Sequence, residues 1–214
     1  MKKKNFDGVA SIYLFLETIT FGNQLQKCRT SMISHLTNSK QVQVLVLGEG
    51  NGRFLEAFCK ANPLAELLVI DESPRMLDLA KRRIANANPP INNQIEFRCA
   101  NVFEILHLSG TFDLIVCNFF LDCFTSSEIG HLLGLFRQML LESGSLVVGD
   151  FRKPHSIFGT FILKIMHVFF KKTAGISATE LTDLHAMLLE SSFQKTVEKK
   201  LFFGFLNSSI WKPV

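Results

Sequence analysis

Two short segments of the sequence combine residue types that suit the binding of a nucleoside. The first, Gly48-Glu49-Gly50-Asn51-Gly52, follows the apolar run 42–47, and glycine lets the backbone turn sharply and approach a ligand closely. The second is Asp71, which follows the apolar run 67–70 and can accept hydrogen bonds from the hydroxyls of a ribose. Both segments follow predicted buried strands, so we expect them to meet at the carboxyl edge of a parallel sheet.

The spacing of the glycines discriminates between two classes of nucleoside ligand. The dinucleotide fingerprint requires Gly-x-Gly-x-x-Gly, but its last position is Arg53 here and the pattern present is Gly-x-Gly-x-Gly. A wide, open loop suits an amino-acid tail better than a pyrophosphate. The loop leads into a predicted helix at 53–61, whose first N–H groups are expected to favour a carboxylate or a phosphate of the ligand.

Alternating apolar strands and amphipathic helices must position these residues. Strands are predicted at 42–47, 67–70, 94–98, 112–117 and 145–149, and helices at 53–61, 74–87 and 128–141, the last broken by Ser143-Gly144. Residues 6–37 are expected to form one or two helices. The runs 194–203 and 206–211 around Gly204 predict a terminal hairpin that adds an antiparallel edge. Strands that alternate with helices in this way predict βαβ units and a parallel sheet, an α/β fold.

Composition and charge argue against several classes of protein. The chain has 214 residues, which suits one α/β domain, and its net charge of +4 is spread over short basic runs that do not predict a nucleic-acid surface. Five cysteines without a Cys-x-x-Cys pair argue against a disulfide framework and against a zinc site, so no metal is expected. Free thiols suit a reducing cytosol, so we expect a cytoplasmic protein. No uncharged apolar run reaches about 18 residues, so we expect no transmembrane segment.

Several segments, in the right order, resemble the motifs of class I S-adenosylmethionine-dependent methyltransferases. Residues 44–52 resemble the first motif, and residues 69–77 resemble the second, including its Asp-x-Ser-x-x-Met-Leu pattern. The segments 97–103, 112–121 and 140–148 resemble the later strands of the family. The layout is closest to the small ubiquinone/menaquinone-biosynthesis-like branch. The resemblance implies a Rossmann-like, seven-stranded, mostly parallel sheet with helices on both faces and an antiparallel last strand.

The resemblance also implies S-adenosylmethionine as the cofactor, S-adenosylhomocysteine as its product, and a set of cofactor-binding residues. Those residues are Gly48, Glu49, Gly50, Asn51, Gly52, Asp71, Glu72, Met76, Asn101, Val102, Asn118, Phe119, Tyr13 and Arg29. The glycine loop would line the methionine portion, and Asp71, with Glu72 nearby, would hold the ribose hydroxyls. Tyr13 and Arg29 are candidates for an N-terminal helical lid over the cofactor.

The adenine and the sulfonium would lie near the ends of the later strands. Met76 would pack on the face of the adenine, while Asn101 and Val102 would contact its edge. The family commonly has an acidic residue there, and the carbonyl of an asparagine can still accept a hydrogen bond. Asn118 and Phe119 would lie beside the sulfonium, close to the acceptor of the methyl group.

The resemblance divides the chain into parts of a single methyltransferase domain. These are an N-terminal lid (1–37), a cofactor-binding core (42–150), acceptor-pocket helices (151–192) and a C-terminal β hairpin (193–214). The apolar run 157–170 would suit the wall of a pocket for a small, lipophilic acceptor, and with Lys171 and Lys172 it is also compatible with a helix resting on a membrane surface.

No catalytic residue is identified by the sequence, although three residues are candidates. His155 and Asp122 follow predicted strands and would lie near the acceptor, and Tyr13 belongs to the lid. Each candidate also has a purely structural interpretation. His155 would lie in a surface loop, Asp122 would cap a helix, and Tyr13 would lie at the edge of the core. Two other functions stay open: an NAD(P)-dependent oxidoreductase, and a non-catalytic protein that binds the cofactor or a membrane surface.

Overall fold

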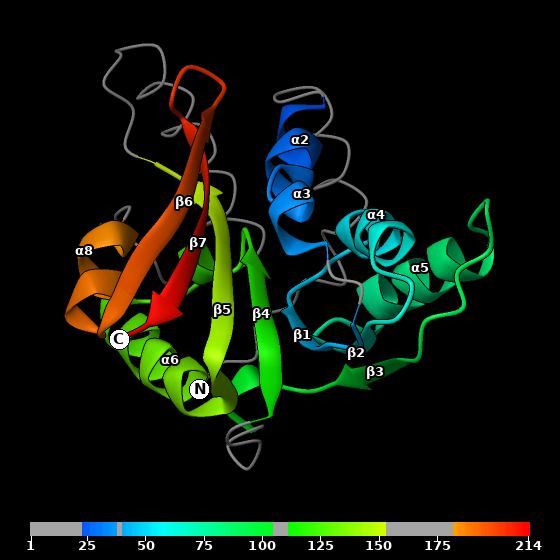
Figure 1. Ribbon diagram of the computed structural model, residues 1–214, viewed down its shortest axis with the longest axis horizontal. Helices are drawn as coiled ribbons and strands as arrows, with labels where there is room; N and C mark the ends of the chain where they lie inside the picture. Colours follow the sequence, from blue (N-terminus) through cyan, green and yellow to red (C-terminus); the bar gives the residue numbers. More distant parts are fainter. Residues whose placement is uncertain (1–22, 38–39, 105–110, 153–181) are drawn as a thin grey trace.

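One mixed sheet forms the centre of the molecule (Figure 1). The computed structural model describes residues 23–37, 40–104, 111–152 and 182–214. The seven strands of the sheet follow the order β3-β2-β1-β4-β5-β7-β6, with β1 to β5 parallel and β7 antiparallel to both of its neighbours. The strands are β1 (Gln43–Leu47), β2 (Glu66–Asp71), β3 (Ile95–Cys99), β4 (Phe112–Asn118), β5 (Leu140–Phe151), β6 (Phe193–Leu201) and β7 (Leu206–Pro213). The predicted fold class is confirmed.

The helices begin where local signals favour a start. The hydroxyl of Ser73 accepts a hydrogen bond from the Met76 N–H at 3.2 Å, and Thr125 forms a reciprocal capping box with Glu128. Two helices lie in the described part of 6–37, as expected, and 6–22 lies outside it. The helices are α2 (Gln24–Thr30), α3 (Ile33–Leu36), α4 (Arg53–Ala61), α5 (Pro74–Ala85), α6 (Ser126–Met139) and α8 (Leu184–Glu190), with 3-10 turns η1 (Val102–Glu104) and η2 (Leu121–Cys123).

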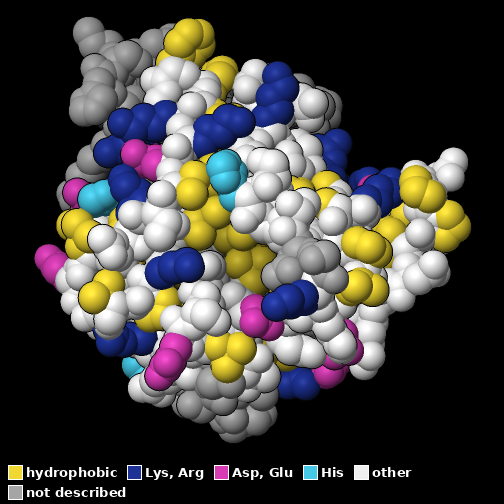
Figure 2. Space-filling view, viewed as in Figure 1, with side chains coloured by type: hydrophobic (Ala, Val, Ile, Leu, Met, Phe, Trp, Pro, Cys, Tyr) yellow, Lys and Arg dark blue, Asp and Glu magenta, His cyan; other side chains and the backbone are white. Residues whose placement is uncertain are grey.

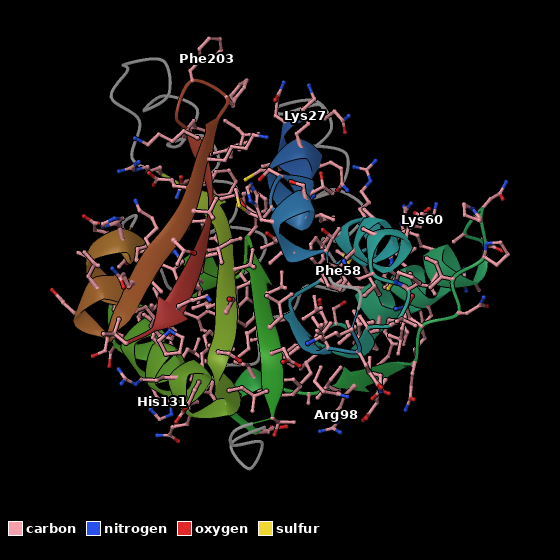
Figure 3. The ribbon with its side chains drawn as sticks, viewed as in Figure 1. Lys27, Phe58, Lys60, Arg98, His131 and Phe203 are labelled. Carbon is pink, nitrogen blue, oxygen red and sulfur yellow. The ribbon has the colours of Figure 1, made fainter. Side chains whose placement is uncertain are left out.

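Alternate residues of the central strands bury two separate cores. Leu45 and Ile115 face the core that α6 and α8 cover, whereas Val44 and Val116 face the core that α4 and α5 cover (Figure 1). Phe58 of α4, labelled in Figure 3, is fully buried in the second core. A strand that is apolar on both faces needs helices on both sides of the sheet, which is what the structure has.

The boundary between α6 and β5 differs from the prediction. The helix ends at Met139 rather than at residue 141, and β5 begins at Leu140, which pairs with Phe112. The register then shifts to Leu114 opposite Ser145. Residues 141–144 therefore form an irregularity inside the strand, and Ser143-Gly144 does not break a helix. Pairing with β4 overrides the helical pattern of the two leucines at 140–141.

The predicted C-terminal hairpin is present, and it adds antiparallel pairing at one edge of the sheet, as expected. The antiparallel strand β7 lies between β5 and β6, so β6 forms the edge of the sheet. Side chains from both faces of β7 are buried, including Ile210 and Trp211, whereas every side chain of β6 except Phe193 is partly or fully exposed. The more apolar strand takes the interior position because it buries more surface there. Phe203 is fully exposed at the tip of the hairpin (Figure 3).

The visible surface is mixed in character. Figure 2 shows Lys and Arg side chains spread over this face, with apolar side chains gathered in a hollow near its centre. Within the ranges that the structure describes, every helix is too short or too polar to span a bilayer.

Candidate cofactor-binding site

The glycine loop and Asp71 meet at the carboxyl ends of β1 and β2. The N–H of Gly48 donates to the carbonyl of Ile70 at 2.9 Å. The two carboxylate oxygens of Asp71 accept from the N–H of Gly50 at 3.2 Å and from the N–H of Ser73 at 2.9 Å. A carboxylate has about four acceptor positions, so Asp71 can hold the loop and also accept from the hydroxyls of a ribose. The expected convergence of these two segments is confirmed.

The three glycines of the loop have different surroundings. A Cβ on Gly48 would lie 2.5 Å from Cδ2 of Phe120, and a Cβ on Gly52 would lie 2.8 Å from Cα of Ala80. A Cβ on Gly50 would meet no described atom within 4 Å. The outer glycines therefore let a phenyl ring and helix α5 approach the loop, while Gly50 leaves open space beside Asp71. This space is where a ligand can lie against the backbone of the loop.

Glu49 turns its side chain away from this space and into the protein. One carboxylate oxygen accepts from the N–H of Phe54 at 3.1 Å and from the N–H of Leu55 at 3.0 Å, in the first turn of α4. The chain's own carboxylate therefore takes the N–H groups that we expected to favour a carboxylate or phosphate of the ligand, and that expectation is corrected. Glu49 can line the cofactor with its backbone but not with its side chain.

The surroundings of Glu49 also change its acidity. Burial raises the pKa of Glu49 to about 7, and the two N–H donors and the nearby Arg29 only partly oppose this effect. Asp71 adds a smaller rise in the same direction. A buried carboxylate at this place, when ionised, would repel a pyrophosphate and attract a positively charged tail.

The predicted adenine-binding residues lie along the ends of β2 and β3. The side-chain N–H of Asn101 donates to the carboxylate of Glu72, and its carbonyl accepts from the N–H of Phe103 at 2.9 Å. Val102 begins η1 and is buried, as is Met76 in the first turn of α5. Because both groups of the Asn101 amide are already bonded within the chain, Glu72 supplies the negative charge at this end of the site.

Asn51 faces a different partner from the other loop residues. The backbone carbonyl oxygen of Asn51 accepts a hydrogen bond from Nε of Arg83 on α5 at 2.9 Å. The predicted cofactor contact at Asn51 is therefore left to its N–H and its side chain.

The turn after β4 is strained and tightly held. Phe119 has a positive φ of 54°, which is rare for a bulky residue, and its N–H donates to the carbonyl of Gly149 at 2.6 Å. The Phe119 ring packs against Phe151, with 5.0 Å between the ring centroids, and the guanidinium carbon of Arg29 lies 5.1 Å from the centre of the Phe119 ring. Such strain persists where surrounding contacts enforce it, often at functional sites.

Helix α2 brings one of the two lid candidates to the site. Arg29 of α2 lies over Phe119 and is close enough to Glu49 to lower its pKa. The other lid candidate, Tyr13, lies outside the described residues, as do the catalytic candidate His155 and the apolar run 157–170.

The side of the site where the acceptor is predicted to bind contains a residue, Asp150, that the sequence analysis does not single out. Asp122, the catalytic candidate that the structure describes, lies in η2, and its carboxylate helps to raise the pKa of Asp150 at the end of β5. Asp150 follows the buried strand residues 146–149 just as Asp71 follows 67–70, and this pattern was the available signal. No three His, Cys, Asp or Glu side chains of the described residues are grouped to hold a metal ion.

Part of the sequence is similar to known methyltransferases. Residues 44–144 match a family model described as a methyltransferase domain. Over 164 residues the chain is 24% identical to the malonyl-[acyl-carrier protein] O-methyltransferase of Priestia megaterium, an alignment that covers 73% of this chain and 55% of that protein. The chain spans between 29% and 55% of the length of the curated relatives that it matches.

Solved structures share the fold at low sequence identity. An O-methyltransferase family 2 protein from Planctomyces limnophilus, in complex with apigenin, matches with a TM-score of 0.71 and 12% identity over 97% of this chain and 62% of that chain. Magnesium protoporphyrin IX methyltransferase from Synechocystis, with bound S-adenosylhomocysteine, matches with a TM-score of 0.64 and 14% identity over 91% of this chain and 88% of that chain.

Proposed function

We propose, from the premise that residues 44–144 are a methyltransferase domain within a class I fold, that this chain transfers a methyl group from S-adenosylmethionine to a small-molecule acceptor. One observation carries the proposal: Gly50 and Asp71 are joined by a hydrogen bond, and open space lies above Gly50. A nucleoside with an amino-acid tail fits this arrangement, with its ribose at Asp71 and its tail along the loop.

The charges around the loop favour the same cofactor. The carboxylate of Glu49, beneath the loop, attracts the sulfonium and the ammonium group, and the guanidinium of Arg29 on α2 suits the carboxylate of the methionine tail. Glu72 is placed to accept from the adenine amino group in addition to Asn101. The pyrophosphate of NAD would instead approach a carboxylate at Glu49, which argues against the oxidoreductase alternative.

The main contribution of the protein to this reaction would be to align the methyl donor with the acceptor. The nucleophilic atom of the acceptor bonds to the methyl carbon, and the carbon–sulfur bond breaks with its electron pair going to sulfur. The positive charge of the sulfonium is thereby lost, and a proton leaves the acceptor if its nucleophile carried one. Such a reaction is accelerated mainly by holding donor and acceptor in line and by excluding water.

Replacing Asp71 by alanine tests the cofactor site. We expect S-adenosylmethionine to bind more weakly by about 1–3 kcal/mol in a calorimetric titration, because the ribose hydroxyls lose a partly buried acceptor and Gly50 loses its partner. Asp78→Ala, at an exposed position of α5, is the matched control and should bind as the wild type does. Equal affinity of the Asp71→Ala protein, or binding of NAD in place of S-adenosylmethionine, would contradict the proposal.

The class of acceptor is a finer proposal. The resemblance to the ubiquinone/menaquinone-like branch and the apolar run 157–170 favour a lipophilic small molecule. The same fold occurs in an apigenin-bound protein and in a methyltransferase named for magnesium protoporphyrin IX. Peripheral contact with a membrane, and a cytoplasmic location, stay predictions.

Labelled cofactor distinguishes the acceptor classes. Protein incubated with methyl-labelled S-adenosylmethionine and a cell extract should place most of the label in the organic-solvent fraction, where lipophilic products partition. The Asp71→Ala protein, in which cofactor binding should be weakened, serves as the negative control. Label confined to polar metabolites would exclude the lipophilic acceptor, and no protein-dependent label in either fraction would count against methyl transfer itself.

A further inference from the structure

The turn that joins β6 to β7 has an unusual backbone conformation. Phe202, Phe203 and Gly204 have positive φ values of 47°, 55° and 81°. Two bulky residues in succession rarely adopt this conformation. The N–H of Phe205 donates to the carbonyl of Phe202 at 3.0 Å, so a backbone hydrogen bond closes the turn. We call residues 201–205 the hairpin tip.

The hairpin tip turns one phenyl ring into solvent. Phe203 is fully exposed, whereas Phe202 is partly buried and Phe205 is buried. Turns with positive φ ordinarily contain Gly, Asn or Asp, which adopt this conformation with less strain. At Phe203 the chain bears both the strain and the exposure of an apolar ring, and the ring fills no space in the core. Strained positions of this kind are often functional.

A series of ring contacts connects the hairpin tip with the cofactor site. The ring centroid of Phe203 lies 5.8 Å from that of Phe202, which lies 6.3 Å from that of Phe205. Phe205 packs against Phe151 at 5.6 Å, and Phe151 packs against Phe119 at 5.0 Å. Phe119 is the strained residue after β4 that is predicted to lie beside the sulfonium. The hairpin tip therefore lies at the same end of the sheet as the cofactor site.

Exposed lysines lie around the hairpin tip. Lys199 and Lys200 are near the end of β6, directly before the tip. Lys27 is on α2, which packs against Phe205 through its apolar face, and Figure 3 shows Lys27 at the same end of the molecule as Phe203. Within the described ranges, none of these three lysines forms a salt bridge. Their charges are therefore available to a partner.

The overall charge around the tip is positive. The N–H of Arg152 donates to the carbonyl of Phe205 at 2.9 Å, which brings a guanidinium to the base of the tip. Glu198 is acidic, but it pairs with Arg152 at 3.7 Å and with Lys195 at 3.1 Å. Figure 2 shows apolar side chains projecting at this end of the molecule, with several Lys and Arg side chains beneath them.

This arrangement matches the layers of an anionic membrane. One exposed phenyl ring alone would not indicate a partner. Here the ring stands beyond a band of basic side chains, so the ring can reach the acyl chains while the basic side chains lie at the phosphates of the headgroups. The charge complementarity and the apolar tip therefore favour the same partner.

We propose that the hairpin tip docks on the surface of an anionic membrane, with Phe203 inserted between the lipid headgroups. The tip is separate in sequence from the apolar run 157–170, so this contact is distinct from the one predicted for that run. Docking in this way presents the end of the sheet that holds the cofactor loop to the membrane. Its use for a lipophilic acceptor rests on the proposed methyl transfer.

Vesicle sedimentation tests the docking. The whole chain, without cofactor, is mixed with vesicles of phosphatidylcholine alone or of phosphatidylcholine and phosphatidylserine in equal parts. We expect binding to the mixed vesicles to be at least about tenfold stronger, because each basic side chain near an anionic surface adds to binding.

A variant of the exposed ring tests its insertion. Phe203→Ser should weaken binding to the mixed vesicles by about tenfold, because the apolar area buried on docking is lost. The ring is fully exposed in the free protein, so the substitution leaves the core intact. Leu189→Ser, at an exposed apolar position of α8 beyond the other end of β6, is the matched control and should bind as the wild type does.

Lysine variants test the electrostatic contribution. Lys199→Gln combined with Lys200→Gln should reduce the preference for phosphatidylserine by about tenfold. Lys81→Gln combined with Arg82→Gln removes the same charge from exposed positions of α5 and should leave the preference nearly unchanged.

Three results would overturn the inference: no stronger binding to the mixed vesicles, unchanged binding of Phe203→Ser, or an unchanged preference in the double lysine variant. Self-association of the wild type that Phe203→Ser abolishes, without vesicle binding, would assign the tip to a second copy of the chain and would also overturn it. Because the experiment uses no cofactor, its failure leaves the proposed methyl transfer standing.

Discussion

Replacing Gly52 by alanine is expected to lower the free energy of unfolding by about 2–5 kcal/mol. Gly52 has a φ of 81°, and a residue with a side chain loses about 1–2 kcal/mol in that left-handed conformation. The new Cβ would also lie 2.8 Å from Cα of Ala80, so the backbone of α5 would have to move, and such overpacking costs about 1–3 kcal/mol. Urea unfolding of the wild-type and variant proteins measures the difference.

Gly50→Ala is the matched control for this prediction. Gly50 also has a positive φ, of 69°, but no described atom lies within 4 Å of its added Cβ. The strain alone should lower the free energy of unfolding by about 1–2 kcal/mol. The new methyl group would occupy the space proposed for the cofactor. The free energy of S-adenosylmethionine binding should therefore decrease by more than the free energy of unfolding does. Equal losses of stability in the two variants would show that contact with α5 is not what requires glycine at position 52.

The second large effect concerns Glu49, whose ionisation destabilises the folded protein. The pKa of this carboxyl is about 7 in the folded chain against an ordinary value of 4.5. The unfolded chain therefore releases the proton at lower pH than the folded chain does. Stability falls as the pH rises from 4.5 to 7, by about 3 kcal/mol in total, and then levels off.

Glu49→Gln should abolish this part of the pH dependence. The carbonyl of glutamine can still accept from the N–H groups of Phe54 and Leu55, but the side chain no longer ionises. Between pH 5 and pH 8 the variant should therefore lose about 2.5 kcal/mol less stability than the wild type in urea titrations. Glu142→Gln, at an exposed position of β5, should follow the wild-type curve. Parallel curves for the wild type and Glu49→Gln would show that Glu49 ionises normally.

Much of the fold could be predicted because its signals are local. The apolar runs 44–47 and 67–70 are buried on both faces, and parallel strands need such runs. Ser73 and Pro74 mark the start of α5 in the sequence itself. The position of β7 between β5 and β6 could not be predicted. The sequence of a hairpin does not indicate which of its two strands pairs with the rest of the sheet.

The cofactor side of the site was predictable for a similar reason. The glycine loop and Asp71 follow neighbouring strands, so parallel pairing brings them together. The inward turn of Glu49 was not predictable, because a charged residue in a loop ordinarily faces water and only tertiary packing shows that its oxygen caps α4.

The position of β7 also bears on how the chain folds during synthesis. Strand β5 pairs with β4 on one side, but its other edge is filled by residues 206–211, which leave the ribosome more than fifty residues later. Until then β5 presents an open edge of N–H and C=O groups, which is the kind of edge that joins other chains in aggregates. A nascent chain halted before residue 206 is therefore expected to need protection by a chaperone, even though the cofactor loop and Asp71 have already been made.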